Sequence, residues 1–195
     1  MMKMIAIIKY NAGNITSVKN AVERLGYECK VTDDIDEVLS AEKVIFPGVG
    51  EAKSAMNHLE SKGLDKIIQS LVQPTLGVCL GLQLMCRHSE EGDTKCLGIF
   101  DAKVKKFPAT DIVPHMGWNN LEVEVNPLFN GFGKDDAVYF VHSYYAEICS
   151  ETIARCDYIL PFSAAMQKDN FYATQFHPEK SGDVGEKILR NFLDL

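Results

Sequence analysis

Short runs of consecutive apolar residues are the feature that most constrains how the first half of this chain can fold. Residues 5–8 read Ile-Ala-Ile-Ile, residues 43–46 read Lys-Val-Ile-Phe, and another short run leads into Val78. Such runs are typical of strands that are buried on both faces, as in parallel sheets. Segments with helical spacing alternate with these runs, so we predict a mostly parallel central sheet flanked by helices.

The first expected helix carries signals at both of its ends. Asn14 can cap a helix whose apolar residues follow helical spacing from Ile15 to Leu25, and Gly26 is placed to end it. Further helices are expected near residues 51–61 and 64–72, and over residues 183–195 at the end of the chain.

Short strands joined by turn residues dominate the second half of the chain, beyond about Cys96. We expect strands at residues 121–125, 137–141, 153–156, 163–166 and 171–176. Consecutive strands of this kind favour antiparallel pairing. We therefore predict one α/β domain over residues 1–195, in which additional antiparallel strands extend the parallel sheet.

Composition excludes several classes of function. The chain has 195 residues, 46% of them hydrophobic, which is enough for one sizeable core, and no low-complexity linker divides it. Its formal charge is −7 and its basic residues are scattered, so it lacks the basic stripe that nucleic-acid binding needs. Neither a nucleic acid nor a membrane is expected as a partner.

The start of the chain and its cysteines bear on the cellular compartment. Residues 1–8 resemble a secretory signal in being apolar, but the segment is too short and no Ala-x-Ala-like site follows, so a buried strand is expected there. Six cysteines form no Cys-x-x-Cys pair, which indicates reduced thiols in the cytoplasm. Metal-binding and phosphate-binding motifs are absent from the sequence, so neither a metal nor a cofactor is expected.

The run from Gly77 to Gln83, Gly-Val-Cys-Leu-Gly-Leu-Gln, predicts a strand, a sharp turn and a helix, with Cys79 at the turn. A thiol at such an elbow lies near unpaired helical amides and the positive end of the helix dipole, which favour the thiolate. The alternative is a buried structural cysteine. Gly77 and Gly81 argue against that alternative, because a tight turn needs small residues and packing alone does not. Cys79 is therefore the candidate nucleophile.

A second motif, Gln-Phe-His-Pro-Glu at residues 175–179, supplies a base and a carboxylate. On an extended chain the side chains of His177 and Glu179 share a face, so the carboxylate can orient the imidazole. His177 could instead be a hydrogen-bonded structural residue that ends a strand. The joint presence of both motifs, in the order Cys, His, Glu, favours a Cys-His-Glu triad.

Three further segments have both a plain and a functional interpretation. Residues 47–50, Pro-Gly-Val-Gly, form either an ordinary strand-ending turn or the second amide of an oxyanion hole beside the Leu80 amide. Residues 114–119, Pro-His-Met-Gly-Trp-Asn, fall in an expected loop, where Trp118 suits either a partner surface or a core. Residues 142–145, His-Ser-Tyr-Tyr, either end a strand or line the site.

Taken together, these motifs resemble those of the class I (triad) glutamine amidotransferases. Residues 77–83 and 175–181 carry the resemblance to the class, while residues 46–50, 114–119 and 139–144 resemble the glutaminase subunits of imidazole glycerol phosphate synthase. The similarity runs essentially from end to end. Residues 9–14 depart from the family pattern, since many relatives carry an aspartate and an extra glycine there.

The resemblance implies a role for each matching residue. Cys79 would attack the side-chain amide of glutamine, with His177 and Glu179 completing the triad. The other implied residues are Val49, after a local backbone rearrangement, and Leu80 in the oxyanion hole; Gly48, Gln83, Glu91, Ser143 and Tyr144 in substrate binding; and Asn14, Trp118 and Lys180 at a partner interface.

The resemblance also implies a partner, namely the cyclase subunit, a (β/α)-barrel, in a heterodimer that serves histidine biosynthesis. Low activity alone and strong activation by the loaded partner are then expected. Two other enzyme functions stay open, a paralogous triad amidotransferase that serves another synthetase and a stand-alone γ-glutamyl cysteine hydrolase. A non-catalytic binding module would not need all three triad residues.

Overall fold

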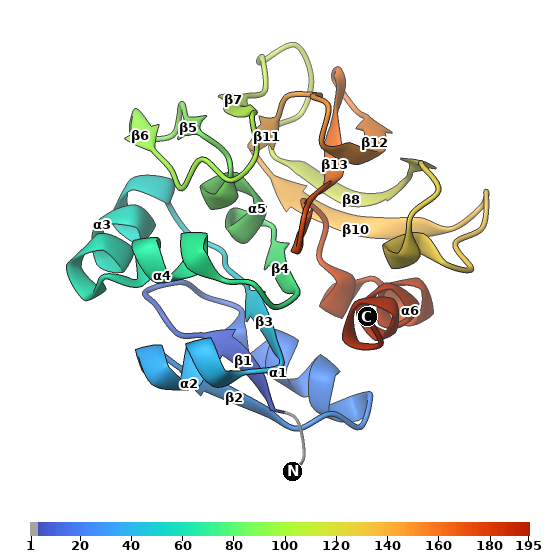
Figure 1. The fold of residues 1–195 in the computed structure, drawn as a ribbon. Helices are drawn as coiled ribbons and strands as arrows, with labels where there is room; N and C mark the ends of the chain where they lie inside the picture. The colour runs from blue at the N-terminus through green and yellow to red at the C-terminus, as the bar shows by residue number, and fades with distance from the viewer. Residues whose placement is uncertain (1–3) are drawn as a thin grey trace.

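Eight strands form the main sheet of the computed structural model, which describes residues 4–195 (Figure 1). The strand order is β2-β1-β3-β4-β14-β13-β12-β9. The first five strands in this order are mutually parallel: β2 (Cys29–Thr32), β1 (Ile5–Ile8), β3 (Lys43–Phe46), β4 (Thr75–Val78) and β14 (Phe171–Thr174). The remaining three pair antiparallel: β13 (Pro161–Lys168), β12 (Thr152–Asp157) and β9 (Glu122–Val123). A parallel half is thus extended by an antiparallel half, as the sequence predicts.

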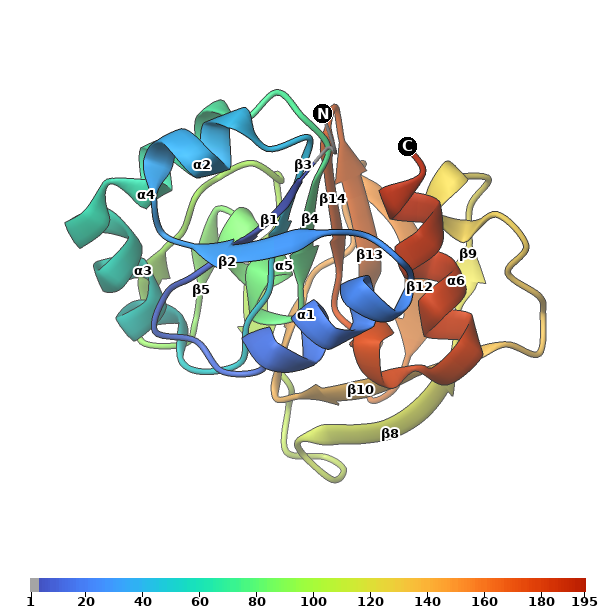
Figure 2. The same ribbon diagram turned by 90° about the horizontal axis from the view of Figure 1, so that it is seen from below.

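Helices cover both faces of the parallel half (Figure 2). Ile5 and Ile7 of β1 pack into one core with α1 (Ile15–Arg24) and α6 (Gly182–Leu193). Ala6 and Ile8, which point to the opposite face, pack into a second core with the other helices. These are α2 (Ile35–Ser40), α3 (Ala52–Lys62), α4 (Leu64–Ser70) and α5 (Leu80–Met85). Among residues 4–195, no helix combines the length and the apolar character needed to cross a bilayer.

Two smaller sheets lie beside the main one. In the first, β8 (His115–Asn120) pairs antiparallel with β10 (Ala137–His142), so that His115 lies opposite His142. The second has the order β11-β7-β5-β6, formed by Tyr144–Ala146, Lys103–Lys106, His88–Ser89 and Thr94–Lys95. Two short 3-10 helices, Pro127–Phe129 (η1) and Pro178–Lys180 (η2), complete the structure of the described residues.

Several expectations need correction. Residues 114–119 were expected in a loop, but residues 115–120 form β8, because pairing with the apolar strand β10 supplies the ladder that their mixed local pattern does not indicate. Helix α2 was not expected, since it is six residues long and buries only Val38. Asn14 precedes α1 as expected, yet its side chain makes no capping hydrogen bond. The part of the expected first strand at residues 1–3 lies outside the described residues.

Parallel pairing of β4 with β14 brings the two sequence motifs together. In this pairing Val78 lies opposite Thr174, so the residues that follow them, Cys79 and Gln175, leave the same edge of the sheet. The amide of Cys79 donates to the carbonyl of Thr174 at 2.7 Å, which continues the ladder to the candidate nucleophile. Carboxyl ends of parallel strands are where ligands bind in such sheets.

Gly185 provides a test of how α6 packs against the turn that bears Glu179. A Cβ atom at residue 185 would lie 1.9 Å from the carbonyl oxygen of Pro178. Although alanine is favoured over glycine in a helix by about 1 kcal/mol, we expect Gly185→Ala to lower the free energy of unfolding by roughly 1–3 kcal/mol, because the helix and the turn must move apart. Urea titration measures this change.

The matched control is Gly133→Ala, where the new Cβ would meet nothing closer than 3.6 Å. An unchanged or raised free energy of unfolding in Gly185→Ala would contradict the packing described for α6.

Candidate active site

Cys79 lies at a strained elbow between β4 and α5. Its φ of 54° and ψ of −102° are sparsely populated for a residue with a side chain. Flanking glycines make the turn possible, as expected: a Cβ at residue 81 would lie 2.0 Å from the Phe46 carbonyl oxygen, and one at residue 77 would lie 3.0 Å from the Gly81 carbonyl carbon. The elbow therefore requires glycine on both sides of the thiol.

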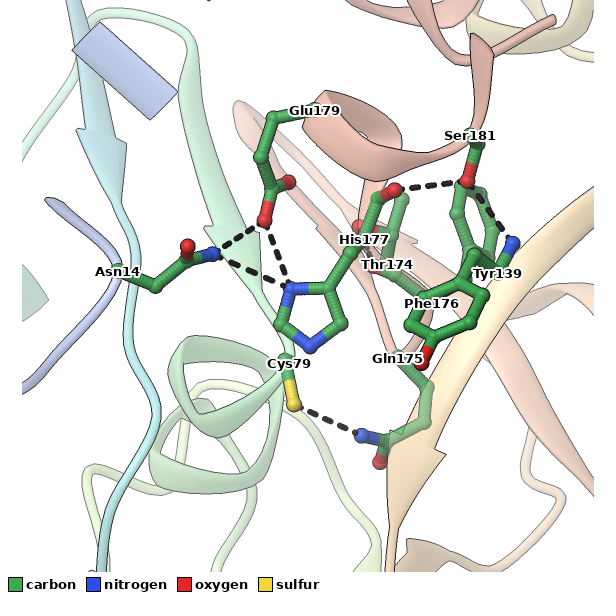
Figure 3. Close-up of polar contacts among 9 residues, drawn as sticks. All are labelled: Asn14, Cys79, Tyr139, Thr174, Gln175, Phe176, His177, Glu179 and Ser181. Carbon is green, nitrogen blue, oxygen red and sulfur yellow. Dashed lines mark hydrogen bonds and ion pairs between the residues drawn. The ribbon is translucent and has the colours of Figure 1, made fainter. Parts of the chain in front are cut away.

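His177 and Glu179 form a buried pair next to this thiol (Figure 3). Nδ1 of His177 lies 2.8 Å from Oε1 of Glu179, and their side chains are 0% and 1% exposed. The other ring nitrogen, Nε2, has no hydrogen-bond partner among residues 4–195 and lies on the edge of the ring that faces Cys79. The three residues expected to form a triad are therefore together.

The route by which Glu179 reaches the imidazole differs from the sequence argument. His177 is extended, with φ of −101° and ψ of 96°, but residues 178–180 form the 3-10 helix η2. It is this turn, and not an extended chain, that returns the carboxylate to Nδ1. Proline at its first position suits such a turn because its fixed φ is already helical.

Hydrogen bonds hold the backbone of His177 against β10. Its amide donates to the carbonyl of Tyr139 at 2.9 Å, and its own carbonyl accepts from the Ser181 hydroxyl at 2.7 Å. The Ser181 oxygen in turn accepts from the Tyr139 amide at 2.9 Å. This ring of bonds fixes the imidazole relative to the strand that borders the cavity.

Electrostatics favour a charged imidazole in this position. Burial lowers the pKa of His177, but the negative charge of Cys79, the hydrogen-bonding groups around the ring and the Glu179 carboxylate together raise the pKa of His177 to about 10. Since the pKa is higher than in an unfolded chain, the imidazolium stabilises the fold fully below pH 6.5, and this contribution is lost as the pH rises through about 10.

Asn14 contacts the triad directly. Its Nδ2 donates to Oε1 of Glu179 and lies 3.5 Å from Nδ1 of His177. Asn14 adopts a left-handed backbone, with φ of 69°, which asparagine tolerates better than most residues and which turns the side chain away from the helix it precedes. The interface residue expected from the resemblance is thus also a neighbour of the carboxylate, a contact that nothing in the local sequence indicates.

A cavity of about 290 Å³ opens at the elbow, and Cys79, which is 6% exposed, forms part of its wall. Four of the five residues expected to bind substrate line it: Gln83, Glu91, Ser143 and Tyr144. Val49 and Leu80 also line it, whereas Gly48 does not. Among residues 4–195, no group of three or more His, Cys, Asp or Glu side chains could hold a metal ion.

Gly48 instead binds the amide of Leu80, one of the two amides expected to stabilise the oxyanion. Its carbonyl oxygen accepts from the Leu80 amide at 3.2 Å, and the next carbonyl, that of Val49, accepts from the Gly13 amide at 3.0 Å. Tyr10 fixes the same loop by donating to the Pro47 carbonyl at 2.6 Å. In this conformation the Leu80 amide is not free for a substrate, so the Gly48–Val49 peptide must rotate before both amides can face one oxyanion.

Glu91 contributes a carboxylate to the lining of the cavity. It accepts from the Ala52 amide at 2.7 Å, at the first turn of α3. Partial burial raises the pKa of Glu91, as does the nearby charge of Glu51, while the Ala52 amide lowers it. The fixed carboxylate can receive a cationic group such as an α-ammonium.

Two of the expected interface residues, Trp118 and Lys180, are exposed. Trp118 is 58% exposed and meets Tyr139 edge to face, with ring centroids 6.0 Å apart, so it is not a core residue, and its place on a partner surface stays a prediction. Lys180 is exposed in η2, one residue after Glu179. Trp118 therefore contacts Tyr139 of β10, which binds the backbone of His177, and Lys180 shares η2 with Glu179.

Gln175 has a contact that its local sequence does not indicate. Its side chain is fully buried, and its Nε2 donates to Sγ of Cys79 at 3.6 Å. A glutamine two residues before the histidine carries no signal of this contact, because it depends on the pairing of β14 with β4.

Comparison with known proteins decides the family. Residues 6–195 match the model of the glutamine amidotransferase class-I family. The chain belongs to this family. Among its relatives, the imidazole glycerol phosphate synthase subunit HisH of Bacteroides thetaiotaomicron is 60% identical over 194 residues, covering 98% of this chain and 99% of that protein. The protein of the same name from Pasteurella multocida is 48% identical, over 99% of this chain and 98% of its own.

Solved structures of other proteins share the fold. One glutamine amidotransferase aligns with a TM-score of 0.77 at 22% identity, over 97% of each chain. The glutaminase domain of CTPS from Trypanosoma brucei aligns with a TM-score of 0.66 at 16% identity, over 98% of this chain and 94% of that one. The predicted fold class, an α/β fold with a mixed sheet flanked by helices, is confirmed.

The electrostatic description of His177 can be tested by NMR. We expect the imidazole to titrate above its ordinary value of 6.5 in the native chain, and Glu179→Gln to lower the pKa of His177 by roughly one to three pH units, because a neighbouring negative charge is removed. Glu186→Gln, which removes an exposed carboxylate bonded to Arg24, is the control and should leave this titration unchanged. A midpoint at or below 6.5 in the native chain would refute the description.

Proposed function

We propose that this chain is the glutaminase subunit of an imidazole glycerol phosphate synthase, and that residues 1–195 form its glutaminase domain. The observation that carries the proposal is the buried His177–Glu179 pair beside Cys79, at the wall of a cavity of about 290 Å³. Glutamine has the size of ligand that such a cavity accommodates. Relatives named as this subunit, 46–60% identical over nearly the whole chain, support the narrower assignment.

In the proposed reaction the sulfur of Cys79 attacks the side-chain amide carbon of glutamine. Nε2 of His177, which has no other hydrogen-bond partner among residues 4–195, holds in the charged pair the proton that the thiol has given up and delivers it to the leaving nitrogen, so that ammonia departs and a glutamyl thioester remains. Water then adds to the thioester, releasing glutamate and restoring the thiol. Glu179 holds the ring in the tautomer that leaves Nε2 facing the sulfur and stabilises the imidazolium.

The tetrahedral oxyanion would be held by the amides of Leu80 and Val49. Because the Gly48 carbonyl accepts from the Leu80 amide, rotation of the Gly48–Val49 peptide is a required step: it frees one donor and turns the other toward the substrate. Removing one such donor typically raises the barrier by about 2.7–4 kcal/mol. The resting loop thus predicts low activity in the absence of a partner, since one donor is occupied and the other is turned away.

The cavity suits the two ends of glutamine. Glu91 offers its carboxylate to the α-ammonium group of glutamine. Ser143 and Tyr144 line the same cavity. Nε2 of Gln83 is already bonded to the Tyr144 carbonyl and to Oε1 of Gln175, so Gln83 is left to accept hydrogen bonds from substrate through its own Oε1. Gly48 would reach substrate only after the loop rearranges.

The partner we propose is the cyclase subunit, a (β/α)-barrel, which would receive ammonia and form a heterodimer in the cytoplasm. Six free thiols in the described chain accord with that compartment. Trp118, Lys180 and Asn14 form the proposed docking face. Contact there can reach the triad, because Lys180 lies in η2 with Glu179, and Trp118 packs on Tyr139, whose carbonyl binds the His177 amide.

Reconstitution with the cyclase tests the function. Cys79→Ala should reduce glutamine-supported synthesis by at least about 10⁴-fold, because the nucleophile is gone, while ammonia-supported synthesis is retained. Cys29→Ala, which removes a half-buried thiol of β2, is the control. Glutamate release and cyclase product are measured in parallel.

The isolated chain should turn over glutamine far more slowly than the complex with a loaded cyclase. Steady turnover by the pure chain would instead support the stand-alone hydrolase. Failure to bind the cyclase, with stable binding of another synthetase, would support the paralogous amidotransferase.

The docking face has its own test. We expect Trp118→Ala to weaken binding of the cyclase by at least about 2 kcal/mol, roughly 30-fold in Kd, because an exposed aromatic residue near the triad is a typical hot spot. Val72→Ala is the control, as Val72 is 85% exposed and follows α4, on a different element. Equal binding by the two variants, measured by calorimetry, would exclude Trp118 from the interface.

A further inference from the structure

We infer that Gln175 is a positioning residue, which holds the sulfur of Cys79 with an N–H donor at the end of a chain of hydrogen bonds whose direction is set by the Tyr144 carbonyl. The inference deepens the proposed function and rests on Cys79 as its nucleophile. The chain has two branches that meet at this carbonyl in β11: one comes from His115 of β8 and His142 of β10, and the other runs through Gln83 of α5 to Gln175, the residue that follows β14. Each of its links joins named atoms within hydrogen-bond distance.

The first two links involve a pair of buried histidines. Nδ1 of His142 lies 2.8 Å from the Tyr144 carbonyl oxygen, and Nε2 of His142 lies 3.1 Å from Nδ1 of His115. A carbonyl only accepts, so Nδ1 of His142 must carry the proton. The neutral ring then has a bare Nε2, which can only accept, so Nδ1 of His115 must be the donor.

The pair stays neutral and rigid. Burial lowers the pKa of His115 to about 4 and that of His142 to about 3. The ring of His115 is stacked on two aromatic rings, with centroids 4.0 Å from Tyr158 and 4.8 Å from Phe140. Both tautomers are therefore fixed near neutral pH.

The same Tyr144 carbonyl fixes the direction of the remaining links. It also accepts from Nε2 of Gln83 at 3.0 Å, which uses its second lone pair and orients the Gln83 amide. The other hydrogen on that nitrogen points to Oε1 of Gln175 at 3.1 Å. Gln175 must therefore present its Nε2, and not its oxygen, to the sulfur of Cys79 at 3.6 Å.

The chemical consequence is a donor on the side of the sulfur not occupied by the imidazole, as Figure 3 shows for Gln175 and His177. A donor stabilises the thiolate and fixes the Cys79 side chain in one position. Gln175 is fully buried and does not line the cavity, so it acts on the nucleophile and not on the substrate. The wall residues Gln83 and Tyr144 belong to the same chain of bonds, which ties the shape of the cavity to the position of the sulfur.

Alkylation of Cys79 by iodoacetamide at neutral pH tests this role without glutamine or a partner. Modified Cys79 is identified by peptide mass spectrometry, with Cys79→Ala as the blank for the other thiols. Gln175→Met keeps the side-chain length but removes the donor, and should slow alkylation on the order of ten-fold. Gln175→Glu turns a donor into a negatively charged acceptor and should slow it further.

Gln69→Met is the matched control. It removes an amide that donates to the Leu97 carbonyl at 2.6 Å, away from the cavity, and should change the alkylation rate of Cys79 by less than about two-fold. Rates within about two-fold of the native rate in both folded Gln175 variants would overturn the inference.

A second variant tests which group sets the direction of these bonds. His115→Phe keeps the stacked ring and loses the donor to His142 but leaves the Tyr144 carbonyl in place, so it should change the alkylation rate of Cys79 by less than about two-fold. Slowing as large as that in Gln175→Met would overturn the role given to the Tyr144 carbonyl. Loss of glutamine hydrolysis in the native complex would refute the proposed function while leaving these readouts intact.

Discussion

The parallel pairing of β4 with β14 is the interaction on which the site depends. Nearly one hundred residues separate the two strands, yet their register places Val78 opposite Thr174 and continues through the Cys79 amide. Without that pairing the thiol of Cys79 and the imidazole of His177 would not be held in a fixed relative position. Among residues 4–195, β14 is also the only strand that links the parallel and antiparallel halves of the main sheet, so the same strand joins the sheet and brings the candidate site together.

Two separate groups of hydrogen bonds hold the residues of the site in place, one around His177 and Glu179 and one at the sulfur of Cys79. On one side, Tyr139 and Ser181 fix the backbone of His177, and Asn14 contacts the carboxylate that orients its ring. On the other side, the amide of Gln175 meets the sulfur. The loop of residues 9–14 contacts the triad through Asn14. It also contacts residues 47–50, through Gly13 and Tyr10. The departure of this loop from the family pattern therefore falls next to the reacting groups.

The sequence predicted what local pattern encodes. Continuous apolar runs identified the parallel strands, glycine spacing identified the elbow at Cys79, and the order Cys, His, Glu identified the triad. Long-range pairing was not readable: β8 looked like a loop because its residues alternate with little apolar content, and short polar strands such as Lys103–Lys106 gain their ladder only from distant partners. The roles of Asn14 and Gln175 were hidden for the same reason, since their partners lie 165 and 96 residues away.

The backbone of Cys79 has a consequence for the evolution of the chain. A left-handed φ of 54° on a residue with a side chain typically costs about 1–3 kcal/mol, and glycine would relieve that strain. Selection for stability alone would thus favour glycine at residue 79, whereas selection for turnover in the proposed reaction requires the sulfur. The two pressures are opposed at this position.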